Sequence, residues 1–155
     1  MFHGPGPQEL GRGPDPKLID DTDAIVRIDT VTICGTDLHI LKGDVPEVTP
    51  GRILGHEAVG TVIETGMATR SVREGDRVLL SLYLGVCSVQ VLPGGAVRPV
   101  PGGRRLDPRS HDRRGAGRVA RVPFADTSTY RIPEGLSDEQ VLYLSDVPPV
   151  TRWGC

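Results

Sequence analysis

Two short segments of the chain, 34–39 and 55–60, carry side chains that could bind a metal ion. Both lie within residues 31–64, and together they hold one thiol, two imidazoles, one hydroxyl and two carboxylates. These residues are Cys34, Thr36, Asp37, His39, His56 and Glu57. Cysteine sulfur and histidine nitrogen are the donors that zinc prefers. Each residue alone also fits a simpler interpretation, a buried cysteine or a surface histidine in a β-domain, but the combination favours a metal site.

The composition narrows the class of protein that could carry such a site. The chain has 155 residues, of which 37% are apolar and only 4% aromatic, with 20 glycines and 14 prolines. This balance predicts a loop-rich domain with more strand than helix. A net charge of −2 argues against a dedicated nucleic-acid or membrane-surface protein. Three widely separated cysteines, Cys34, Cys87 and Cys155, and a terminus without a signal-peptide pattern predict a cytoplasmic protein with reduced thiols.

Strands and one short helix are expected to position the candidate metal site. Residues 1–23 are rich in glycine and proline and predict an irregular lead-in. Residues 24–29 are largely β-branched and predict a strand that leads directly to the first segment. A helix is expected over 36–41, with Thr36 as its N-cap, followed by a loop over 42–52. Two further strands are predicted at 58–64 and 76–80.

The character of the chain changes after residue 81. Residues 85–121 hold eight of the sixteen arginines and no lysine, glutamate, isoleucine or aromatic residue. Because no helical or strand period persists there, we expect 82–120 to be disordered or poorly packed. A basic patch for nucleic acid is the alternative, and the lack of stacking aromatic residues counts against it.

Regular structure is expected to return near residue 119. Residues 119–133 predict a strand, a turn and an edge strand. Residues 137–140 (SDEQ) form a capping-box pattern that opens a helix over 141–144, which Pro148 and Pro149 stop. We therefore assign 24–81 and 121–147 to one domain, with an aberrant tail over 148–155.

Three motifs in this order resemble a known family. They are CGTDLH at 34–39, GHEAVG at 55–60 and GDRV at 75–78. They resemble the catalytic domain of zinc-dependent alcohol dehydrogenases, in the medium-chain dehydrogenase/reductase family. The resemblance covers about residues 15–81 and 121–147. It implies a mainly β fold with short helices (α+β), a chaperonin-10-like (GroES-like) partly open barrel, which we expect to be incomplete here.

The resemblance also implies a ligand set for catalytic zinc. Cys34 and His56 match two ligands of the family, and Glu57 matches an adjacent carboxylate that can approach the metal. Asp146 matches the third ligand in the branch of the family that uses aspartate at that position. Three protein ligands with one open position are what a catalytic zinc site requires.

The same resemblance implies roles for three neighbouring residues. Asp37 is expected to accept a hydrogen bond from the non-ligating nitrogen of His56 and so to fix its tautomer. Thr36 is expected to hydrogen-bond the bound alcohol, and His39 to pass the alcohol's proton to solvent. The implied reaction is hydride transfer from a zinc-bound small alcohol to NAD or NADP, or the reverse reduction of an aldehyde.

The sequence departs from the family pattern in three ways. It contains no Gly-x-Gly-x-x-Gly turn between a strand and a helix, so we expect no Rossmann domain and no cofactor-binding residue in it. Where the family usually places four close cysteines, this chain has Cys87 alone. Residues 104–111 and the tail at 149–154 resemble family sequence translated in a shifted reading frame. A smaller instance is residues 8–13.

Three hypotheses remain open from the sequence. The first is an oxidoreductase domain, truncated and partly frame-shifted, that is weak or inactive alone. The second is a non-catalytic zinc-binding or structural β-module. The third is a non-functional remnant that folds poorly. The particular alcohol, the choice between NAD and NADP, and the oligomeric state cannot be predicted from these residues.

Overall fold

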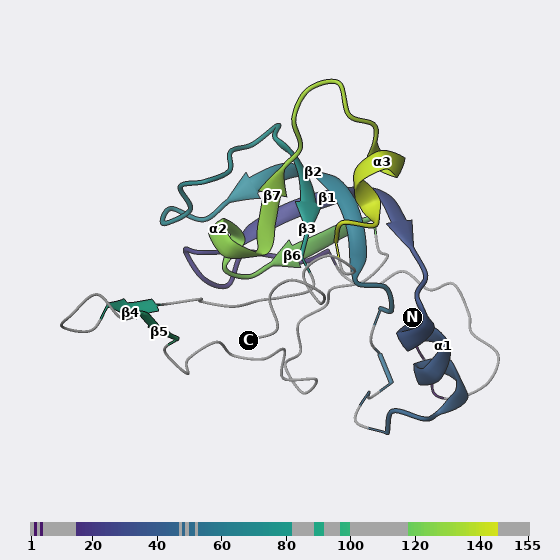
Figure 1. The fold of residues 1–155 in the computed structure, drawn as a ribbon. Helices are drawn as coiled ribbons and strands as arrows, with labels where there is room; N and C mark the ends of the chain where they lie inside the picture. Colours follow the sequence, from purple (N-terminus) through teal and green to yellow (C-terminus); the bar gives the residue numbers. More distant parts are fainter. Residues whose placement is uncertain are drawn as a thin grey trace.

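A computed structural model gives the arrangement of the chain. The structure describes residues 2, 4, 15–46, 48, 50–51, 53–81, 89–91, 97–99 and 118–145. Within this part of the chain, no helix is long and apolar enough to cross a membrane. A five-stranded antiparallel sheet dominates the fold, and three short helices lie around it (Figure 1).

The order of strands in the main sheet is β6-β1-β2-β3-β7. The two long central strands are β1 (Ala24–Thr32) and β2 (Glu57–Thr65), which pair antiparallel. β3 (Arg77–Leu80) pairs with β2, and the edges are formed by β6 (Val119–Val122) and β7 (Thr129–Arg131). β1 and β2 are rich in β-branched residues, which favour extended backbone.

The two central strands approach each other closely because β2 contains Gly60. A Cβ atom at this position would lie 2.2 Å from the carbonyl oxygen of Arg27 on β1. A side chain there would force the strands apart, so glycine is required by packing. Gly60 faces the larger apolar core of the sheet, a cluster made of Ala24, Val26, Ala58, Val62, Val72, Val78, Leu80, Val122 and Ala125.

The opposite face of the sheet is covered by α3 (Asp138–Leu142). Val141 and Leu142 of this helix pack against Val59 of β2 and Leu79 of β3. The helix begins after Ser137, whose backbone N–H donates to Oε1 of Gln140 at 2.9 Å. The predicted capping pattern is therefore confirmed, and the helix ends at Leu142, two residues before the predicted end.

The turn between β6 and β7 contains α2 (Ala125–Ser128) and is tied to a distant loop. Oδ1 of Asp126 accepts hydrogen bonds from the backbone N–H and the hydroxyl of Ser71, both at 2.7 Å. The backbone N–H of Arg70 donates to the same carboxylate at 2.9 Å. Partial burial raises the pKa of Asp126, but these hydrogen bonds outweigh it and leave the pKa below its ordinary value.

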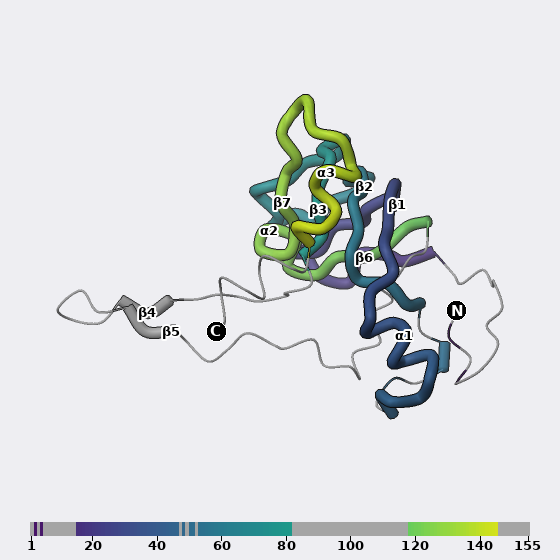
Figure 2. The backbone as a smooth tube through the Cα atoms, turned by 45° about the vertical axis from the view of Figure 1, so that its right-hand side comes forward, coloured from purple at the N-terminus to yellow at the C-terminus, as the bar shows by residue number. Residues whose placement is uncertain are grey.

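The remaining helix, α1 (Gly35–Lys42), lies at the far end of β1 and β2, away from α3 (Figure 2). β1 continues three residues beyond the predicted strand, to Thr32, and so delivers the chain to this helix. The expected strand, turn and strand over 119–133 are confirmed, with α2 inside the turn.

Two short strands lie inside the arginine-rich window, where the residue pattern predicts none. β4 (Val89–Val91) and β5 (Val97–Pro99) pair antiparallel in a separate two-stranded sheet. β6 also begins at Val119, inside the predicted 82–120 segment. A local ladder needs only three residues per strand, too few to produce a visible sequence period. Residues 82–88, 92–96, 100–117 and 146–155 lie outside the described residues, and their predicted disorder and aberrant character stay predictions.

Candidate metal centre

Cys34 stands where β1 ends and α1 begins. Its backbone is extended, with φ −109° and ψ 176°, and it is the N-cap of the helix. Its Sγ accepts a hydrogen bond from the backbone N–H of Thr36 at 3.2 Å. The prediction that Thr36 caps the helix is therefore wrong. Thr36 lies inside the first turn, because the chain enters helical geometry one residue earlier, at Gly35.

Asp37 joins the two segments that carry the candidate ligands. Its side chain is buried, with 4% exposed. Oδ2 accepts from the backbone N–H of Cys34 at 3.0 Å, and Oδ1 accepts from the backbone N–H of Gly55 at 3.0 Å. One carboxylate thus joins Cys34 to the residue before His56, although Asp37 and Gly55 lie 18 positions apart in sequence. The sequence motifs did not reveal this clamp, and the predicted hydrogen bond from His56 to the Asp37 carboxylate stays a prediction.

Three of the four predicted metal ligands come together. The Sγ of Cys34 lies 3.2 Å from Nε2 of His56. A carboxylate oxygen of Glu57, the first residue of β2, completes a group whose donor atoms all lie within 4.8 Å of one another. Glu57 is buried, whereas Cys34 and His56 are partly exposed. Solvent therefore reaches part of both Cys34 and His56.

The Cys34–His56 pair has a spacing that suits zinc. Zinc–sulfur and zinc–nitrogen bonds of about 2.3 and 2.0 Å at a tetrahedral angle place the two donors about 3.5 Å apart. The observed 3.2 Å is within a few tenths of an ångström of that value. A thiol, an imidazole and a buried carboxylate are also donors that zinc accepts. These residues thus fit the metal that the sequence predicts.

Thr36 and His39 lie on the exposed side of α1. Nδ1 of His39 is 2.9 Å from Oδ2 of Asp44, and both side chains are more than half exposed. Asp44 follows Gly43, whose left-handed backbone ends the helix at φ 90°. The sequence prediction placed Asp44 in a loop without a role. The sequence signal for the His39–Asp44 contact was Gly43, because a glycine C-cap turns the chain back toward the last helical turn.

Asp146, the fourth predicted ligand, lies outside the described residues. The preceding residue, Ser145, is fully buried, and its hydroxyl donates to the carbonyl oxygen of Leu80 on β3. Asp146 stays a predicted ligand.

The alcohol dehydrogenase GroES-like domain family matches residues 20–98, just over half of the 155-residue chain. The chain belongs to this family. The predicted resemblance and the predicted GroES-like, mainly β fold are therefore confirmed. The match also reaches residue 98, whereas the motifs predicted that the first stretch of the resemblance ends at about 81 and that a second stretch covers 121–147. The first part of the arginine-rich window, including β4 and most of β5, is thus part of the family match.

Individual relatives agree with the family match. A probable zinc-binding alcohol dehydrogenase of Mycobacterium tuberculosis is 35% identical over 157 residues, covering 94% of this chain. An alcohol dehydrogenase of Cupriavidus necator is 36% identical over 168 residues, covering 95%. Among solved structures, zinc dependent alcohol dehydrogenase 2 from Streptococcus pneumonia superposes with a TM-score of 0.74 at 34% identity, covering 92%.

The chain spans less than half of the length of each of these relatives. It spans 38% of the length of the Mycobacterium tuberculosis protein, 44% of the Cupriavidus necator protein and 40% of the Streptococcus chain. Family membership therefore covers the domain described above, and the activity of a whole relative is a separate question.

Proposed function

We propose that this chain supplies the catalytic-zinc domain of a zinc-dependent alcohol dehydrogenase. The reaction would oxidise a small alcohol to an aldehyde or ketone, with hydride transferred to NAD or NADP and one proton released. The observation that carries the proposal is the Cys34–His56–Glu57 cluster, with Sγ and Nε2 only 3.2 Å apart inside the family's own motifs. The choice between NAD and NADP is left to the experiment.

In this proposal the zinc ion is held by Cys34 and His56, with Glu57 beside it and Asp146 as a further ligand. When bound, zinc supplies a Lewis acid that lowers the pKa of an alcohol. Asp37 keeps the two ligand segments together by accepting from the backbone N–H groups of Cys34 and Gly55. The geometry of the donor pair then depends in part on these backbone hydrogen bonds.

The alcohol's proton needs a route to solvent, and α1 carries the residues for it. Thr36, two residues after Cys34, has a hydroxyl that can accept a hydrogen bond from a bound alcohol and donate its own proton onward as it takes the alcohol's proton. His39 can take it further, because its imidazole is exposed and its Nδ1 is oriented by Asp44 at 2.9 Å. An exposed imidazole can exchange protons with water, which completes the route to solvent.

The first test is metal content. The wild-type chain is expected to bind about one zinc per molecule, as measured by elemental analysis after gel filtration. Cys34→Ser and His56→Gln are expected to lose it, and Cys87→Ser, a matched cysteine variant away from the motifs, is expected to keep it. Cobalt substitution adds a second readout, since a cobalt–thiolate absorption band is expected in wild type and absent in Cys34→Ser. Full zinc binding by Cys34→Ser would refute the proposed centre.

The second test separates catalysis from metal binding. NADH and NADPH production is measured with a panel of small alcohols on the zinc-loaded chain. Turnover that disappears in Cys34→Ser supports the oxidoreductase. Zinc binding without turnover supports the alternative, a non-catalytic zinc-binding β-module. The Cys34–His56–Glu57 cluster would serve either role, so turnover decides between the two.

A further inference from the structure

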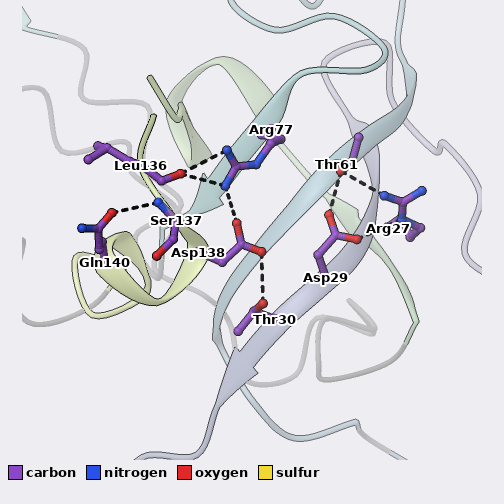
Figure 3. A network of polar contacts seen from close by, with 9 residues as sticks. All are labelled: Arg27, Asp29, Thr30, Thr61, Arg77, Leu136, Ser137, Asp138 and Gln140. Atoms are coloured by element: carbon purple, nitrogen blue, oxygen red, sulfur yellow. Dashed lines mark hydrogen bonds and ion pairs between the residues drawn. The ribbon is translucent and has the colours of Figure 1, made fainter. Parts of the chain in front are cut away.

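A polar network joins three segments that are far apart in the sequence (Figure 3). The guanidinium of Arg77, on β3, donates from Nη1 and Nη2 to the carbonyl oxygen of Leu136, each at 3.2 Å. Its Nη2 also forms an ion pair with Oδ1 of Asp138, the first residue of α3. The other oxygen of Asp138, Oδ2, accepts from the hydroxyl of Thr30 on β1 at 3.1 Å. The network therefore fixes α3 to both β3 and β1.

The network lies on the same face of the sheet as the buried metal-site carboxylate. Thr30 pairs with Val59, and Thr32 pairs with Glu57 in the β1–β2 ladder. Directly paired residues of neighbouring strands point to the same face, as do residues two apart along a strand. Thr30, Thr32, Val59 and Glu57 thus share one face. Cys34 follows two residues after Thr32. β1 therefore connects the network to Cys34 along the chain and to Glu57 through the β1–β2 ladder.

The helix has few other contacts to hold it there. α3 has only five residues, too short to be stable on its own. Its apolar packing within the described residues consists of Val141 and Leu142 against Val59 and Leu79, with Ile132 beside them. Asp138 is about one-fifth exposed and Arg77 two-fifths exposed, so their charge-assisted contact is partly shielded from water. The polar network is therefore the part of the attachment that fixes the orientation of α3 on the sheet.

We propose that Asp138, with Arg77 and Thr30, is a positioning residue for the metal centre. It holds α3 over the face of β1 and β2 that ends in Glu57 and Cys34, and it sets the path of the chain from α3 to the buried Ser145. This inference rests on the proposed zinc centre. Asp138 touches neither metal nor substrate and acts through the strands that carry the ligands.

The same sheet face contains a second network with matching chemistry. Nε of Arg27 donates to Oδ1 of Asp29 at 2.9 Å, and the hydroxyl of Thr61 donates to Oδ2 of Asp29 at 2.7 Å (Figure 3). Burial raises the pKa of Asp29, but the hydrogen bonds from Arg27 and Thr61 outweigh it and lower the pKa overall. This network links only β1 and β2, which are already joined by their ladder. Asp29 is therefore the matched control for Asp138.

The experiment compares Asp138→Asn and Thr30→Val with Asp29→Asn and Thr61→Val in the full chain. Zinc affinity is measured by competition with a chromophoric chelator, and the cobalt spectrum reports the ligand geometry. Hydrogen exchange of the α3 amides is followed in metal-free protein. Asp138→Asn and Thr30→Val are expected to weaken zinc binding by about tenfold, the lower end seen when outer partners of metal ligands are removed. They are also expected to shift the cobalt band and speed exchange in α3.

The control variants distinguish a positioning role of Asp138 from a general effect of losing a polar network on this sheet face. Asp29→Asn and Thr61→Val are expected to leave zinc affinity and the cobalt band unchanged, and Thr30→Ser, which keeps the hydroxyl, is expected to restore both. Equal loss of affinity in the Asp138 and Asp29 variants would overturn the positioning role while leaving the zinc centre intact. A wild-type chain that binds no zinc would refute the zinc centre itself. If Asp138→Asn does not fold, the Thr30→Val and Thr30→Ser pair carries the comparison, because it removes and restores a single hydrogen bond.

Discussion

Replacement of Asp37 tests whether the candidate metal centre depends on the hydrogen bonds that support its ligands, as well as on the ligands themselves. The Asp37 side chain is 4% exposed, and its two oxygens each accept a backbone N–H at 3.0 Å, one from Cys34 and one from Gly55. In Asp37→Ala both N–H groups lose their acceptor. Hydrogen bonds to a charged group contribute roughly 1.5–3 kcal/mol each. Taking the lower end of this range for both bonds, we expect the free energy of unfolding to fall by about 3 kcal/mol, a large share of a domain's usual stability.

Asp37→Asn gives an intermediate case. The amide keeps one acceptor oxygen and loses the charge, so about half of the loss, roughly 1.5 kcal/mol, is expected. The assay is denaturant unfolding of the metal-free protein in excess chelator, followed by circular dichroism. The same variants are then titrated with zinc. Because the clamp holds the two ligand segments together before metal binds, the affinity for zinc is expected to fall in the same order as the stability.

Asp44→Ala is the control for these variants. Asp44 is also a carboxylate near α1, but it is more than half exposed, and its carboxylate contacts the exposed imidazole of His39. Its loss is expected to change stability by no more than about 0.5 kcal/mol. The clamp is refuted if Asp37→Ala and Asp44→Ala have the same unfolding free energy. If zinc affinity falls while metal-free stability does not, Asp37 acts by orienting His56, as the family resemblance implies.

Three further outcomes follow from the described residues. The unfolding temperature of Gly60→Ala, measured by calorimetry, should be several degrees lower than that of Gly75→Ala. A Cβ at position 60 would lie 2.2 Å from the Arg27 carbonyl oxygen, whereas position 75 has open space and only an unfavourable φ of 90°. For Asp126, the lowered pKa means that its stabilisation is present above about pH 4 and is lost as the pH falls through the folded-state pKa. Asp126→Asn should therefore flatten the acid limb of a stability–pH curve. Chelation of zinc should lower the unfolding temperature of wild type and leave that of Cys34→Ser unchanged.

Local patterns were sufficient to predict most of the regular structure. The β-branched stretches at 24–29 and 58–64 predicted the two central strands, and the SDEQ pattern predicted the start of α3. Each of these signals acts within a few residues, through side-chain preference for extended backbone or through a cap. The prediction was wrong for the cap of α1, where a thiol took the place expected for a hydroxyl. Thiols are weak acceptors, and the usual N-cap preferences do not include them.

The three motifs also predicted which residues could bind a metal, but not how they are held. Nothing in the spacing of Cys34 and Gly55 indicates that one carboxylate accepts from both, since that contact depends on how the loop between them returns. The ties from Thr30 to Asp138 and from Ser71 to Asp126 span 108 and 55 positions. Contacts of this kind depend on strand order, which local patterns do not specify.

The sequence by itself determined the ligand types, the family and the β-branched stretches that form the two central strands. These depend on the chemistry of single residues and on their spacing along a short stretch. Only the tertiary structure decided that Cys34 and His56 stand 3.2 Å apart, that Asp37 clamps their segments, and that α3 is fixed over the face carrying Glu57. The physical reason is that these distances arise from the register of β1 against β2 and from the packing of α3 on β2 and β3, which involve residues distant in the chain.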